Sequence, residues 1–72
     1  MPTASLPLID HVYRNGVEDL LVIQVNRAVV VCIPQNDERK FALGGATWTL
    51  PTVTWNKQNP TKLRRVASEE IV

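Results

Sequence analysis

The sequence predicts a mainly β fold, built as a small antiparallel barrel of short strands. Two neighbouring runs, Leu20–Val25 and Ala28–Ile33, are rich in Val and Ile, whose branched side chains favour a pleated strand. Turn-forming Gly, Pro and Asn residues recur at short intervals along the chain. A length of 72 residues leaves room for one domain. We expect that domain at residues 8–67, between a flexible arm at residues 1–7 and a tail at residues 68–72.

The two aliphatic runs are expected to pair as a hairpin, because only Asn26 and Arg27 separate them. Asn tolerates a positive φ, but Arg is poorer than Gly at the second position of a two-residue turn, so a slightly longer loop with a bulge is an alternative. A buried helix over Glu18–Val25 is another alternative, since the periodicity of a short apolar run does not distinguish a helix from a strand. Both faces of the hairpin are apolar, unlike those of a sheet with one face in water. A closed barrel, a terminal segment or another subunit must therefore cover the second face.

Further strands are expected on both sides of this hairpin. Val12 and Tyr13 precede the turn signal Asn15-Gly16 and indicate a first short strand. After a polar loop, Lys40–Leu43 alternates, with Phe41 and Leu43 on one face, and the next two residues, both Gly, permit a sharp bend.

Two alternating segments follow that bend. Ala46–Leu50 places Trp48 and Leu50 on one side, and Pro51 then marks an edge strand, a bulge or a turn. Thr52–Trp55 resumes the period of two and predicts a strand in which the Trp55 ring lies on the same side as the preceding valine.

The C-terminal segment has two interpretations. Asn59-Pro60 is typical of a helix start, with Asn as N-cap, and Leu63, Val66 and Ala67 then lie on one face of a short helix. The alternative is a single 3₁₀ turn followed by a last strand over Leu63–Ala67. With either one, the chain has the scale and the five strands of an SH3-like or OB-like barrel with one short helical turn near its C-terminus. The order of elements resembles that of small barrel proteins encoded by phages and prophages, and no motif identifies a family.

The residue inventory argues against enzymatic, metal-binding and membrane functions. One His, one Cys and scattered acids offer no convergent metal ligands, and no Gly-rich phosphate loop is present, so no cofactor is expected. His11 and Asp10 with Ser5 or Ser68 form the one formal catalytic set, which we attribute to accident. Cys32 lies in an apolar run and is expected to be a buried hydrophobe. Without a signal-peptide pattern or an apolar run of membrane length, the chain is expected to be cytoplasmic.

Positive charge is concentrated in one part of the chain. Residues 39–66 contain six Lys and Arg residues and no acid, although the net charge of the whole chain is only +1. Such asymmetry indicates an anionic partner. Because cations bind phosphates and aromatic rings stack on bases, our first hypothesis is a non-enzymatic module that contacts nucleic acid without strong sequence specificity. The alternative is that the tryptophans are core and the cations form a solvated rim. The residues expected at the contact are Arg39, Lys40, Trp55, Lys57, Lys62, Arg64 and Arg65, with Trp55 as the stacking residue.

The second hypothesis is a protein-interaction or assembly module, such as a phage-type accessory or inhibitor protein. The two-sided apolar hairpin would then join copies of the chain into a homo-oligomer, and an edge strand over Thr47–Trp55 would pair with a strand of the partner. The interface residues expected in this case are Leu20, Val22, Val30 and Trp48.

Overall fold

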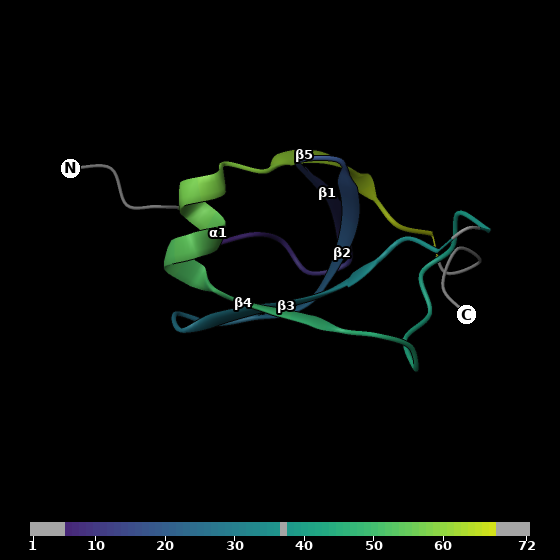
Figure 1. Cartoon of the computed structure of the whole chain (residues 1–72), viewed down its shortest axis with the longest axis horizontal. Helices are drawn as coiled ribbons and strands as arrows, with labels where there is room; N and C mark the ends of the chain where they lie inside the picture. The colour runs from purple at the N-terminus through teal and green to yellow at the C-terminus, as the bar shows by residue number, and fades with distance from the viewer. Residues whose placement is uncertain (1–5, 37, 68–72) are drawn as a thin grey trace.

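The structure is a computed structural model that describes residues 6–36 and 38–67. These residues form one antiparallel sheet with the strand order β4-β3-β2-β1-β5 and one short helix, so the mainly β class is confirmed (Figure 1). β4 and β5 are the two edges of the sheet, which is not closed, so the expected barrel type is not established. The elements are β1 His11–Asn15, β2 Glu18–Val25, β3 Val29–Pro34, β4 Trp48–Pro51, α1 Thr52–Gln58 and β5 Thr61–Arg65.

The predicted hairpin is formed by β2 and β3, and its turn takes the longer of the two forms considered. The side chain of Asn26 organises this turn, because its Oδ1 accepts hydrogen bonds from the backbone N–H groups of Ala28 (2.8 Å) and Val29 (2.9 Å). The backbone N–H of Asn26 in turn donates to the carbonyl oxygen of Val29 (3.0 Å). An Asx-type turn of this kind does not need Gly at the position of Arg27.

A bulge in β2 distributes its aliphatic side chains between two clusters. The register with β3 shifts between Val22 and Gln24, which leaves Ile23 without a partner. An extra residue in one strand reverses the alternation of the side chains that follow it. Accordingly, Ile23 packs against one core cluster and Val25 packs against the other.

Residues of the same chain cover both faces of the hairpin. One core cluster adds Tyr13 and Trp55 to the residues of the hairpin, and the other adds Val12, Phe41 and Val66. The three hairpin residues that were expected at an interface between copies are completely buried in the first cluster, so this fold does not offer them to a second copy. They are Leu20, Val22 and Val30, whereas the fourth expected residue, Trp48, is 38% exposed.

The strand predicted over Thr52–Trp55 is wrong, because this segment begins α1. The buried residues follow a helical spacing: Thr52 and Trp55 are both buried, while Val53 is 70% exposed. Thr52 is also fixed to the β2–β3 turn, where its Oγ1 donates to the carbonyl oxygen of Asn26 (2.8 Å). These tertiary contacts override the strand preference of Thr and Val.

Asn59-Pro60 ends α1 and does not start a helix. Asn59 adopts the left-handed conformation (φ 52°), and its backbone N–H donates to the carbonyl oxygen of Asn56 (3.2 Å). A left-handed Asn followed by Pro is a common helix stop. The chain then enters β5, which confirms the alternative of a last strand, although that strand begins earlier than expected.

The segment Lys40–Leu43 was expected to be a strand, but it contains only an isolated bridge at Phe41. Phe41 is completely buried and Leu43 is 53% exposed, so the two side chains do not share an environment. The expected bend does follow, with the N–H of Gly45 donating to the carbonyl oxygen of Ala42 (3.0 Å). Phe41 is thus a buried core residue that comes from an irregular segment and not from a strand.

The ends of the domain are partly described. Pro7, in the predicted arm, is buried, and the N–H of Leu8 donates to the hydroxyl of Tyr13 (3.0 Å). Residues 1–5 of the arm and the predicted tail lie outside the described residues. Among the residues that are described, none belongs to a helix with the length and apolar character needed to cross a membrane.

Candidate nucleic-acid interface

The edge strand β5 carries the densest positive charge. Lys62, Arg64 and Arg65 occupy three of its five positions, and every side chain of the strand is exposed. Lys62 lies opposite Tyr13 of β1, and Arg64 lies opposite Val12. Because residues directly opposite each other in a sheet project to the same face, these two cations extend to opposite faces of the edge. β5 can therefore present charge on both sides of one exposed strand.

A turn that precedes Phe41 adds two exposed cations. The side chain of Asn36 shapes this turn by accepting a hydrogen bond from the backbone N–H of Lys40 (2.9 Å). The backbone N–H of Arg39 donates to the carbonyl oxygen of Asn36 (2.9 Å), and Arg39 is held in the left-handed region at φ 61°. Phe41 and Val66, which directly follow Lys40 and β5 in the chain, belong to the same buried cluster. The turn and the end of β5 therefore meet at one end of the molecule (Figure 1).

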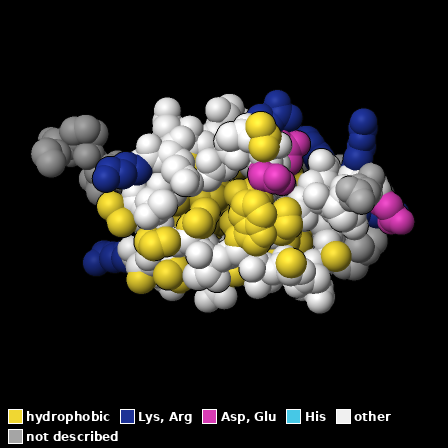
Figure 2. All heavy atoms as spheres, in the orientation of Figure 1, with side chains coloured by type: hydrophobic (Ala, Val, Ile, Leu, Met, Phe, Trp, Pro, Cys, Tyr) yellow, Lys and Arg dark blue, Asp and Glu magenta, His cyan; other side chains and the backbone are white. Residues whose placement is uncertain are grey.

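Lys57 lies away from these cations. It is an exposed residue of α1, and α1 lies at the opposite end of the molecule from residues 38–45 (Figure 1). Figure 2 shows Lys and Arg side chains near β5 and at the end of the molecule that lacks α1, others at the α1 end, and hydrophobic side chains between them. Of the predicted contact residues, Lys62, Arg64 and Arg65 share β5, and Arg39 and Lys40 lie at the end of the molecule where β5 ends.

Trp55 does not provide the exposed stacking surface that was expected. It is only 3% exposed, and its ring packs edge-on against Tyr13, with centroids 5.5 Å apart and an interplanar angle of 73°. Stacking on a base needs an open ring face. Trp48 is more accessible and lies opposite Cys32 on the sheet, but no predicted cation neighbours it in the ladder.

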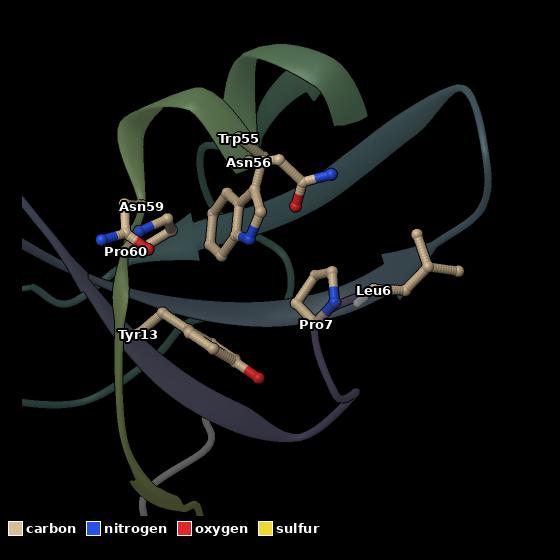
Figure 3. Close-up of a pocket in the computed structure, with 7 residues that line it drawn as sticks. All are labelled: Leu6, Pro7, Tyr13, Trp55, Asn56, Asn59 and Pro60. Atoms are coloured by element: carbon tan, nitrogen blue, oxygen red, sulfur yellow. The ribbon is translucent and has the colours of Figure 1, made fainter. Parts of the chain in front are cut away.

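A pocket of about 330 Å³ lies beside Trp55, between α1 and β1 (Figure 3). The rings of Tyr13 and Trp55 and the carboxamides of Asn56 and Asn59 line it. Apolar side chains, those of Leu6, Pro7 and Pro60, complete the wall. Sequence reasoning does not find this pocket, because its residues come from separate segments, and because Asn59-Pro60 reads as a helix start when the preceding helix is taken for a strand.

Within the described part of the chain, the other reactive side chains do not assemble into a site. No group of three or more His, Cys, Asp or Glu side chains suited to a metal ion occurs within residues 6–36 and 38–67. His11 lies with its Nδ1 2.9 Å from the carbonyl oxygen of Ile9. Cys32 is buried, and burial raises the pKa of its thiol to about 11. No protein-family model matches the chain, and no curated protein or solved structure is significantly similar to it.

Proposed function

We propose that this chain is a small non-enzymatic module that binds nucleic acid through its phosphate backbone, with little sequence specificity. The supporting observation is that an exposed edge strand carries three cations in five positions and no acid. We call the surface formed by Arg39, Lys40, Lys62, Arg64 and Arg65 the basic surface. Contacts from Lys and Arg to phosphates position a strand but carry no sequence information.

The salt dependence of binding measures how many of these cations contact phosphates. Each phosphate that a protein cation neutralises lowers the slope of log K against log salt by about 0.9 for duplex DNA and about 0.7 for a single strand. Five contacts would therefore give a slope of about −4.5 on duplex and about −3.5 on a single strand. A protein-interaction module would show no such slope with oligonucleotides.

The test is fluorescence anisotropy with labelled random-sequence oligonucleotides, single-stranded and duplex, over a salt series. The double variant Arg64→Gln/Arg65→Gln should make the slope less negative by about 1.4 to 1.8 units, since two phosphate contacts are lost. The matched control is Arg27→Gln/Lys57→Gln, which removes the same charge from exposed positions on the β2–β3 turn and α1. We expect the control to keep the wild-type slope.

Two outcomes would overturn this proposal. Equal losses in both double variants would mean that binding follows net charge and not the basic surface. An absence of binding at low salt would leave the protein-interaction module as the remaining hypothesis.

A further inference from the structure

The pocket between α1 and β1 contains two hydrogen-bond donors that have no acceptor within residues 6–36 and 38–67. The first is the Nε1–H of Trp55, a group that can only donate. No side-chain nitrogen or oxygen of the described residues is both enclosed and unpartnered, so this nitrogen retains access to the pocket. The second is the hydroxyl of Tyr13, whose oxygen accepts the backbone N–H of Leu8 (3.0 Å) and whose hydrogen is left to donate. A ligand of this pocket must therefore present acceptors.

The lining of the pocket is uncharged and rich in rings. It contains Tyr13, Trp55 and two prolines, and no Lys, Arg, Asp or Glu. A phosphate group would have no cation to pair with inside it. Trp55 is 3% exposed and Tyr13 is 8% exposed, so neither ring has an open face on which a base could stack. The lining thus favours an uncharged ligand with carbonyl oxygens and small apolar groups.

Pro7 shows which apolar group fits against these rings. It is buried, and Figure 3 shows it across from the indole nitrogen of Trp55 and the hydroxyl of Tyr13. A proline-containing segment of the same chain therefore already forms one wall of the pocket. A ligand with prolines suits the remaining space for a second reason. Each proline presents a carbonyl acceptor and has no backbone N–H, so it leaves no donor of its own unpaired.

We propose that this pocket binds a proline-rich peptide of a partner protein, with an acidic residue beside the prolines. Proline-rich peptides form a preformed extended helix without internal hydrogen bonds, and they dock in aromatic-lined grooves. A pocket of about 330 Å³ is at the small end of the range of about 300–1,000 Å³ that is usual for ligand sites, so we expect it to hold a short part of the peptide.

Charge complementarity places the acidic residue. Lys62 lies directly opposite Tyr13 in the β1–β5 ladder, and residues opposite each other project to the same face of a sheet. The ammonium group of Lys62 is therefore on the face of the sheet that carries the pocket. This inference goes beyond the proposed function, and Lys62 is the residue that the peptide site shares with the basic surface.

The test uses a Trp48→Phe background, in which Trp55 is the only tryptophan and its indole proton gives one NMR resonance. Three capped peptides of equal length are titrated: hexaproline followed by Glu, hexaproline followed by Gln, and a Gly-Ser peptide followed by Glu. We expect the first to bind with a dissociation constant below about 1 mM and to shift the indole resonance. The Gln peptide should bind about two- to fivefold more weakly, and the flexible Gly-Ser peptide at least about tenfold more weakly.

Three variants show whether the proposed groups make these contacts. Tyr13→Phe keeps the ring and removes the hydroxyl, so it should weaken both proline peptides about fivefold. Lys62→Gln should abolish the difference between the Glu and Gln peptides without changing the affinity for the Gln peptide. Lys57→Gln removes the same charge from an exposed position on α1 that does not line the pocket, and it should keep the difference. Circular dichroism checks that the variants are folded.

The outcomes separate this inference from the proposed function. Failure of both proline peptides to bind, equal binding of the Gly-Ser peptide, or binding that leaves the indole resonance unchanged would overturn the peptide pocket. A random-sequence single strand that shifts the indole resonance when the peptides do not would identify a base as the occupant and would also overturn it. None of these results affects the phosphate contacts, because those are measured by the salt slope with oligonucleotides.

Discussion

At the scale of single residues, substitutions at two glycines isolate the free-energy cost of a left-handed backbone conformation, because neither position is crowded. Gly16 closes the β1–β2 turn at φ 68°, and a Cβ added there would meet no atom within 4 Å. Gly16→Ala should therefore destabilise the protein by about 1 kcal/mol through the left-handed conformation alone. Gly44 is equally open but has no positive φ, so Gly44→Ala is the matched control and should be neutral or stabilise by up to about 1 kcal/mol. Urea unfolding measures both, and a shared midpoint for the two variants would contradict this account.

The thiol of Cys32 should make stability depend on alkaline pH. Burial raises its folded-state pKa from 9.0 to about 11, so the unfolded chain loses this proton first as the pH rises. The contribution of the thiol is therefore complete below pH 9 and is lost as the pH rises through about 11. The substitution Cys32→Ala removes this pH-dependent contribution. The stability difference between wild type and Cys32→Ala in urea should shrink between pH 8 and pH 10.5, and a constant difference would argue against a buried thiol.

At the scale of elements, one side chain outside the regular strands is a central part of the cover on one face of the sheet. Phe41 is completely buried in the cluster that contains Val12 and Val66, although its segment forms only one bridge. Phe41→Ala should destabilise the protein by about 3–5 kcal/mol, which approaches the total stability of so small a domain. Phe41→Leu, which keeps most of the volume, should cost less than about 2 kcal/mol and stay measurable by thermal unfolding.

Leu43 supplies the control for this prediction, because it lies two residues away and is 53% exposed. Leu43→Ala should change stability by less than about 0.5 kcal/mol. Similar losses at both positions would contradict the assignment of this stabilisation to the buried ring of Phe41.

At the scale of the whole molecule, the covered faces change what is expected of self-association. The sequence suggests a homo-oligomer because both faces of the hairpin need cover, and residues of the same chain provide that cover through Trp55 on one face and Phe41 on the other. We therefore expect light scattering at about 50 µM to give the mass of one copy, 8.1 kDa. A stable dimer would point to a different surface, with the half-exposed Trp48 as the first residue to substitute.

The sequence by itself determined the features that depend on neighbours along the chain. The β2–β3 hairpin follows from two runs of branched residues around Asn26, and the first turn follows from Asn15-Gly16. The burial of Cys32 follows from its apolar neighbours, and the concentration of cations in β5 is visible in the composition. Each of these depends on local propensity or on a period of two, which a short window of sequence contains.

Only the tertiary structure decided which segments cover the hairpin. Thr52–Trp55 alternates like a strand, yet it forms the first part of α1, where Thr52 bonds to the β2–β3 turn and Trp55 is buried against Tyr13. The formation of α1 also buries the ring of Trp55, which was expected to stack on a base, and it creates the pocket beside that ring. These outcomes depend on contacts between residues far apart in the chain: Thr52 and Asn26 are separated by 26 positions, and Trp55 lies still farther from Tyr13. A helix this short is not stable by its own propensity and forms only where it is packed, which local sequence does not reveal.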